Sequence, residues 1–159
     1  GVENDAILQA LSQLKEAVGD RVILTAGKMH ASGVLSEAGE KILTENEVES
    51  FVDAGADVIL LPAPGTVPGI SMEYAAKLIK RAHEKGALAM TTIGTSQEGA
   101  DEDTIRQIAL MCKMAGADIH HIGDSGYMGM ALPENIMAYS VAIRGKRHTY
   151  RRMAVSLLR

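Results

Sequence analysis

One pattern occurs four times along this chain: a helix with one apolar face, a turn that contains glycine, a short apolar strand, and a polar loop that opens the next helix. The clearest copies are residues 54–61 (AGADVILL) and 115–122 (AGADIHHI), and weaker copies are residues 18–24 (VGDRVIL) and 85–90 (KGALAM). Glycine stands where a helix end favours a left-handed residue, and mainly apolar strands are typical of a parallel sheet buried on both faces. Strands that alternate with helices predict an α/β fold, whose ligands bind at the carboxyl ends of the strands.

Hydrophobic periodicity predicts where each element lies. A helix over Asp5–Val18 precedes the first strand, and Thr44 with Glu47 forms a capping box for the next helix. Long connections in compact domains often carry function, and we interpret residues 30–44 as a lid or a partner contact. The expected strands are residues 22–29, 58–61, 87–93 and 118–122, and the later helices begin near Ser71, Asp101 and Pro133, the last continuing or breaking at Gly145.

Four βα units amount to half of a TIM (βα)8 barrel. A closed barrel typically needs about 250 residues, whereas the chain has 159. Two chains could complete a barrel, the chain could be a fragment of a longer protein, or the strands could form an open flavodoxin-like sheet with helices on both faces. The last alternative is disfavoured, because the chain lacks a phosphate fingerprint in its first loop and a fifth strand. We expect residues 1–159 to form a single α/β half-barrel domain, either a fragment or one half of a dimeric barrel, and hence a homo-oligomer.

Composition narrows the classes of function. The chain is 47% hydrophobic and 23% charged, with a formal net charge of -4, as is usual for a globular domain. It has no apolar run near the roughly 20 residues of a membrane helix and no signal-peptide pattern at its start, so we expect a cytoplasmic protein without a membrane partner. Scarce aromatic residues and an acidic balance argue against a nucleic acid partner, and the basic run 144–152 fits a solvated helix end. Cys112 is expected to be a buried structural thiol.

Three segments at the predicted strand ends carry a family resemblance. Residues 60–65 (LLPAPG), 91–96 (TTIGTS) and 120–127 (HHIGDSGY) resemble a poorly characterised family of bacterial TIM-barrel proteins. The chain looks like the C-terminal half of such a protein, so the resemblance covers nearly all of this sequence and half of the family's length. It implies a barrel fold and leaves the activity open. Some members of the family carry the label haloacid-dehalogenase-like hydrolase.

That label can be tested on one motif. Hydrolases of this type carry Asp-x-Asp-x-Thr at the end of a hydrophobic strand, with the first aspartate as nucleophile, and residues 101–104 (DEDT) have similar letters. Here a polar loop, residues 96–100, precedes the motif, and an apolar helical pattern starts at Ile105. Acidic residues in a first helical turn complement the helix dipole, so we interpret the motif as a helix cap.

Lys28 and His30 stand at the carboxyl end of the first predicted strand. A lysine that is desolvated there could serve as a Schiff-base amine, or as an acid or base towards an enolisable carbonyl substrate. A salt bridge at the rim is the structural alternative. We favour the salt bridge, because a lone lysine has no sequence signature.

Glycine-bearing loops follow the third and fourth predicted strands, where many barrels bind phosphate through backbone N–H groups. Asp124 would repel a phosphate unless it is paired, and glycine and serine also serve as plain turn formers, which is the interpretation we favour. The candidate binding residues are Gly94, Thr95, Ser96, Gly123, Ser125 and Gly126.

His120 and His121 are adjacent in the fourth predicted strand, so their side chains point to opposite faces and only one can look into a barrel. Together with His30, Glu98 and Asp124 from neighbouring strand ends, the inward histidine could ligate a divalent metal. It could equally be a general acid or base, or a buried and hydrogen-bonded histidine. No metal ligand is assigned on this basis, and the cofactor stays unknown.

The pattern favours a lyase, aldolase or isomerase that acts on a phosphorylated or carboxylated sugar-like metabolite. Lys28 would be the base or electrophile, His120 or His121 would carry the proton, and His30 and Asp124 would lie beside them. The glycine loops would bind phosphate or an oxyanion. A metal-dependent or haloacid-dehalogenase-like hydrolase is one alternative, and a non-catalytic assembly or ligand-sensing barrel remnant is another.

Overall fold

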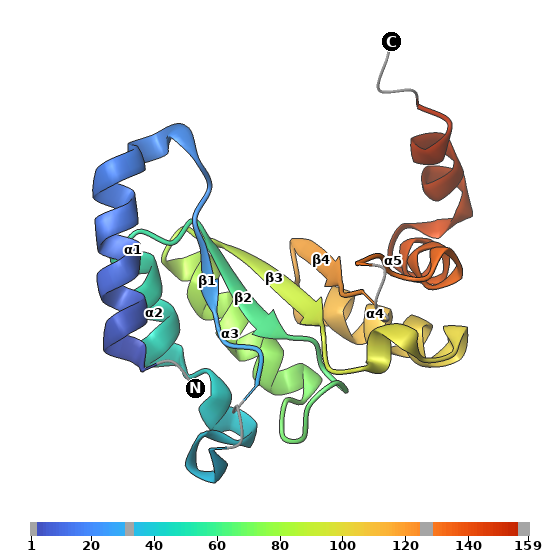
Figure 1. Cartoon of the computed structure of the whole chain (residues 1–159). Coiled ribbons are helices and arrows are strands. Elements are labelled where there is room, and N and C mark those ends of the chain that lie inside the picture. The colour runs from blue at the N-terminus through green and yellow to red at the C-terminus, as the bar shows by residue number, and fades with distance from the viewer. Residues whose placement is uncertain (1–2, 31–33, 125–128, 156–159) are drawn as a thin grey trace.

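A computed structural model of the chain describes residues 3–30, 34–124 and 129–155. Helices and strands alternate along the described chain, as the repeated pattern predicts, and short 3-10 turns lie in the connections (Figure 1). The elements are α1 (Asn4–Val18), β1 (Thr25–Gly27), α2 (Glu45–Asp53), β2 (Val58–Pro62), α3 (Met72–Glu84), β3 (Leu88–Ile93), α4 (Glu102–Ala115), β4 (Ile119–Ile122) and α5 (Pro133–Met153).

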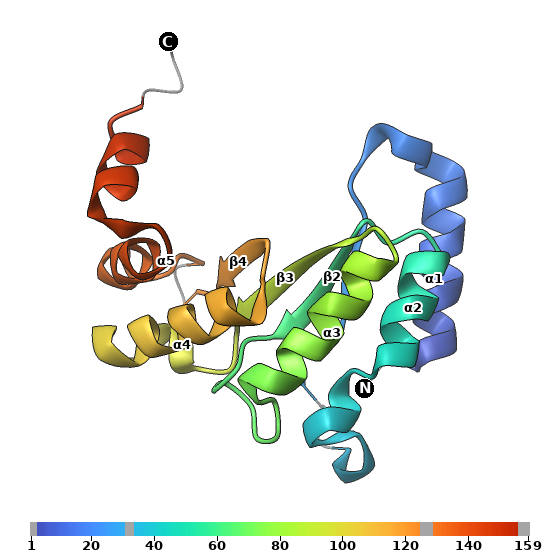
Figure 2. The same ribbon diagram turned by 180° about the vertical axis from the view of Figure 1, so that it is seen from behind.

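The four strands form one parallel sheet in the order β1-β2-β3-β4. A flavodoxin-like sheet has the order 2-1-3-4-5 and helices on both of its faces. In this chain successive strands are neighbours throughout, and successive helices pack beside one another along one face of the sheet (Figures 1 and 2). The half-barrel prediction is therefore confirmed, and the flavodoxin-like alternative is wrong.

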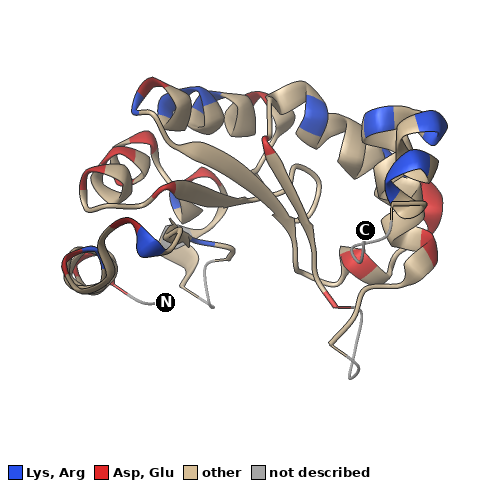
Figure 3. Cartoon of the chain, turned by 90° about the horizontal axis from the view of Figure 1, so that it is seen from above, with Lys and Arg blue, Asp and Glu red and all other residues tan. Residues whose placement is uncertain are grey.

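The core lies between the sheet and its helices in two clusters. The first joins β1, β2 and β3 to α1, α2 and α3 around Phe51, Leu61 and Leu78. The second lies between β3, α4 and α5 around Ile93, Ile108 and the buried Cys112, as predicted for this thiol. Both clusters belong to the convex, helix-covered side, which Figure 3 shows curving around the sheet.

Among the described residues, no helix lies over the opposite, concave face of the sheet (Figure 3). Strand residues alternate between the two faces, so Leu60, Leu88 and His121 share the concave face while Ile59 and Ala89 face the helices. Ile59 and Ala89 are 0% exposed, whereas Leu88 is 49% exposed. An apolar face left open in this way is the interior of a barrel that lacks its other half.

The repeated Ala-Gly-Ala-Asp sequence has one structural role in both clear copies. Gly55 and Gly116 have φ values of 111° and 96°, which reverse the chain after a helix. The aspartate that follows each glycine then accepts a hydrogen bond from a backbone N–H at the start of the preceding strand. Asp57 Oδ2 lies 2.8 Å from Leu24 N, and Asp118 Oδ2 lies 2.8 Å from Ala89 N. The repeat therefore sets the spacing of neighbouring strands.

The first strand departs from its prediction. It was expected over residues 22–29, but only Thr25–Gly27 are paired with β2. Val22 and Ile23 are 47% and 76% exposed, because β2 begins opposite Thr25 and β1 is an edge strand with a single neighbour. In the described part of the chain, no helix is long and apolar enough to cross a membrane.

Candidate functional site

Parallel strands bring their carboxyl ends to one edge of the sheet, and the polar residues predicted as a site follow those ends. Lys28 follows β1, Gly94 follows β3, and Gly123 follows β4. Backbone hydrogen bonds hold the edge together, from Ala63 N to Thr92 O at 2.9 Å and from Gly123 N to Ile93 O at 2.8 Å. This carboxyl edge, with the concave face below it, is the candidate site.

Lys28 forms an ion pair with Glu47 of α2, with 2.8 Å between Nζ and Oε1. The two side chains are only 12% and 16% exposed. Glu47 also accepts from Thr44 N at 2.7 Å and Thr44 Oγ1 at 2.9 Å, and from the amide of Asn4. Burial raises the pKa of Glu47, but the hydrogen bonds from Lys28, Thr44 and Asn4 outweigh it and leave the pKa below its usual value. The salt bridge that the sequence favoured for Lys28 is present, in a partly buried form.

The pairing limits the chemistry of Lys28. A Schiff base forms through an amine that is free to attack a carbonyl carbon, and the amine of Lys28 is engaged by a carboxylate. Glu47 therefore fixes the position of Lys28 Nζ at the end of β1. A nucleophilic role would first require the ion pair to open.

His120 and His121 point to opposite faces of the sheet, as predicted. His120 faces α5, where its Nδ1 lies 3.0 Å from the hydroxyl of Tyr139 and the two rings meet edge to face. Burial lowers the pKa of His120, the charge of Arg144 lowers it further, and Asp118 raises it. His121 pairs in register with Thr92 on the concave face and is exposed. Of the two histidines, His121 is thus the one that faces the barrel interior.

The loop after β3 holds Gly94, Thr95 and Ser96 together at the edge. Thr95 Oγ1 is 2.8 Å from both Thr66 O and Gln97 Oε1, so this hydroxyl fastens the loop to the one after β2. Ser96 has φ 82°, the left-handed region that a non-glycine residue adopts at a cost of about 1–3 kcal/mol. Backbone strain of this kind is found more often at functional sites than elsewhere.

The loop after β4 is less favourable to a phosphate. Gly123 donates its N–H to Ile93 O at 2.8 Å, so this group is already used. Asp124 is exposed. Ser125 and Gly126 lie outside the described residues. Of the two loops proposed to bind phosphate, the one after β3 is the better placed.

A metal site is not assembled in the described structure. Within residues 3–30, 34–124 and 129–155, no group of three or more His, Cys, Asp or Glu side chains could hold an ion. His30 is exposed at the end of β1, and His121, Glu98 and Asp124 belong to other strand ends. These side chains do not form the ligand cluster that the sequence suggested.

The sequence analysis did not identify Asn135 or Thr92, and it considered Glu98 only as a metal ligand. Asn135 of α5 is 2% exposed and donates to Glu98 O at 2.8 Å and Ala100 O at 2.9 Å, which pins the turn after β3. In the described part of the chain, Thr92 Oγ1 and Glu98 Oε2 are buried without a hydrogen-bond partner. Only Glu98 had a sequence signal, as a carboxylate near a strand end. Asn135 had none, because its contact joins segments 37 residues apart.

Asp101 is a helix cap. Its carboxylate accepts from Thr104 N at 2.8 Å at the start of α4, and this bond is the main reason that its pKa is lowered. The structure thus gives the DEDT segment the capping role that the sequence favoured, at a helix start rather than at the end of a hydrophobic strand.

The sequential sheet, the helices on one face and the polar carboxyl edge define a half-barrel α/β protein of the (βα)8 type. Residues 1–159 match the family described as Domain of unknown function (DUF7916), and the chain belongs to that family.

Two curated proteins share part of the sequence. The "Putative N-acetylmannosamine-6-phosphate 2-epimerase" of Haemophilus influenzae is 34% identical over 88 residues, which are 55% of this chain and 33% of that protein. The protein of the same name from Actinobacillus pleuropneumoniae serotype 5b is 33% identical over 87 residues, 55% of this chain and 32% of its own. The match therefore spans about a third of the length of these relatives.

A solved structure shares the fold. The deoxyribose phosphate aldolase from Aeropyrum pernix, described as a unique tetrameric structure, superposes with a TM-score of 0.62 at 19% sequence identity. The superposition covers 89% of this chain and 57% of the aldolase chain. At this level of identity the likeness concerns the fold alone.

Proposed function

We propose that this chain supplies half of a (βα)8 barrel that acts on a phosphorylated sugar-like metabolite as an isomerase or lyase, with epimerisation next to a carbonyl group as the leading reaction. The observation that carries the proposal is the partly buried Lys28–Glu47 ion pair at the carboxyl edge of a half-barrel. The named activity of the matching relatives, a sugar-phosphate 2-epimerase, supports the reaction class.

In the proposed reaction the carbon next to the carbonyl group loses a proton from one face and gains a proton from solvent on its other face. Lys28, held by Glu47, would stabilise the oxyanion that develops on the carbonyl oxygen. His121, exposed on the concave face, would carry the proton in place of His120, whose ring is turned to α5. The loop at Gly94, Thr95 and Ser96 would bind the phosphate group through backbone N–H groups.

The proposal includes a partner for the open face. A second copy of the chain would complete the barrel, cover the concave apolar residues and give the two edge strands, β1 and β4, new neighbours. In that assembly each site at a carboxyl edge would be closed by the other copy.

The direct test is exchange of the C2 proton of the substrate with solvent. The chain is incubated with N-acetylmannosamine 6-phosphate in deuterated buffer, and NMR follows the loss of the C2 proton signal and the appearance of the C2 epimer. The proposal predicts both in wild type and a loss of about 100-fold or more in Lys28→Met and His121→Asn.

Lys77→Met is the matched control, because Lys77 also pairs with a glutamate, Glu45 at 2.7 Å, but lies exposed on α3. It should leave the exchange rate unchanged. Absence of exchange from a preparation of dimeric protein, or an exchange rate that Lys28→Met leaves intact, would contradict the proposal.

A further inference from the structure

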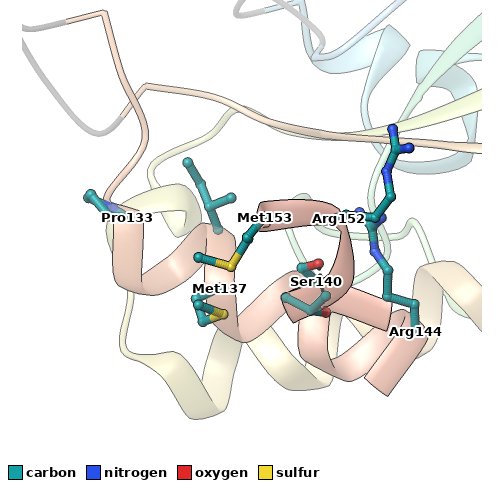
Figure 4. A pocket seen from close by; sticks show the side chains of 8 residues that line it. Pro133, Met137, Ser140, Arg144, Arg152 and Met153 are labelled. Atoms are coloured by element: carbon teal, nitrogen blue, oxygen red, sulfur yellow. Dashed lines mark hydrogen bonds between the residues drawn. The ribbon is translucent and has the colours of Figure 1, made fainter. Parts of the chain in front are cut away.

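A cavity of about 490 Å³ lies beside α5 and is lined by residues of that helix alone (Figure 4). It exists because α5 is broken at Gly145, whose φ of 79° and ψ of 162° are not helical. The helix therefore consists of residues 133–144 and residues 146–153, and the cavity is lined from both segments. Its volume is within the range of about 300–1,000 Å³ that is usual for small-molecule sites.

The two segments are joined by a partly buried polar contact. Ser140 Oγ lies 3.0 Å from Thr149 Oγ1, and Thr149 is only 3% exposed. This contact fixes the second segment against the first and so sets the width of the cavity. The cavity is thus part of the packed structure of α5.

The lining of the cavity is apolar on one side and basic on the other. Met137 and Met153 approach each other from the two segments, while Arg144 and Arg152 lie at the other side (Figure 4). Pro133 and Ile136 add to the apolar lining. A thioether surface adapts to many apolar shapes, and a guanidinium group binds carboxylate or phosphate through two parallel hydrogen bonds.

Unlike Arg81 and Arg106, the two arginines of the cavity have no acidic partner among the described residues. Arg81 and Arg106 each pair with two carboxylates. For Arg144 and Arg152, no acidic side chain in the described part of the chain lies within salt-bridge distance. Two uncompensated positive charges therefore stand at one side of an apolar cavity.

We propose that this cavity binds a small amphipathic anion, with its carboxylate or phosphate group at Arg144 and Arg152 and its apolar body against Met137 and Met153. Charge complementarity selects the anion, and the methionine side requires the apolar part. This site is separate from the sugar-phosphate site proposed above, and its test does not depend on turnover.

The test compares four probes by calorimetric titration. Octanoate and octyl phosphate have both an anionic group and an apolar chain, inorganic phosphate has only the anionic group, and octyltrimethylammonium has the same chain with a positive charge. Saturable one-to-one binding of octanoate or octyl phosphate is expected, at least about tenfold tighter than inorganic phosphate, with no saturable binding of the ammonium probe. The stronger of the two anions identifies a carboxylate or a phosphate headgroup as the preferred one.

Variants locate the binding. Arg144→Gln and Arg152→Gln should each weaken it at least about tenfold, since each removes one charge-assisted contact. Arg147→Gln is the matched control: it makes the same change in the same basic run, at an exposed side chain that does not line the cavity. Equal losses in all three variants, equal affinity for inorganic phosphate and octyl phosphate, or binding of the ammonium probe would overturn the proposal.

Discussion

A single carboxylate connects three parts of the chain at the candidate site. Glu47 caps its own helix through Thr44, holds the ammonium group of Lys28 at the end of β1, and accepts from Asn4 at the start of α1. Sequence reasoning found two of these roles separately, the capping box and the salt bridge of Lys28. It could not place them on one glutamate, because the partner of a lone lysine depends on how β1 and α2 pack.

Replacing Glu47 tests this account of the edge. Glu47→Gln should lower the free energy of unfolding by about 2 kcal/mol near pH 7, because it leaves the partly buried Lys28 without its counter-charge. The folded-state pKa of Glu47 is lowered, so its contribution is present above the ordinary glutamate pKa and is lost as the pH falls below that value. Urea denaturation at several pH values should show the two proteins converging in acid.

Glu49→Gln is the control for this change. Glu49 pairs with Arg81, but its side chain is 30% exposed and takes no part in the edge. A smaller loss is expected, on the order of 0.5 kcal/mol. A Glu47 variant that is as stable as this control at neutral pH would contradict the central role given to Glu47.

The pKa of His120 depends on the charge of Arg144, which lines the α5 cavity. After burial, the nearby charge of Arg144 is the second cause that holds the pKa of His120 below its usual value. Arg144→Gln should therefore raise the pKa of His120, whereas Arg147→Gln should change it less. An NMR titration of the histidine ring protons measures both, and an unchanged or lowered pKa in Arg144→Gln would contradict the placement of this charge.

Among the elements, the helices and the strands β2, β3 and β4 were predictable from sequence, and β1 was not. Helix α1 begins at Asn4, one residue before the predicted start, and β2 and β3 lie within one residue of their predicted limits. These elements have apolar periodicity that packing reinforces. The first strand was predicted far too long, because Val22 and Ile23 have strand-like side chains but no neighbouring strand to pair with.

Helix α4 offers a test of the DEDT segment. Asp101→Ala should cost about 1 kcal/mol of stability through loss of the bond to Thr104 N, while Asp101→Asn should cost little, since asparagine caps helices about as well. Thermal or urea unfolding of the two variants distinguishes them. Equal destabilisation by both would show that the carboxylate charge, rather than the cap, is what α4 requires.

At the scale of the whole molecule, the described helices cover one face of the sheet only. The four βα units of the sequence predict half of a barrel. The observed order β1-β2-β3-β4 confirms that successive strands are neighbours, as they are in a barrel. The positions of the candidate side chains were only partly predictable. The alternation of side chains along β4 predicts that one of the two histidines faces inward. Only the structure identifies that histidine as His121, because His120 packs against Tyr139 of α5.

The measurement that tests the central claim most directly is the mass of the protein in solution, by light scattering on a sizing column. A half-barrel that is closed by a second copy should elute as a single species of twice the chain mass of 16.9 kDa. A cooperatively folded monomer of 16.9 kDa at all accessible concentrations would contradict the claim that two copies complete the barrel.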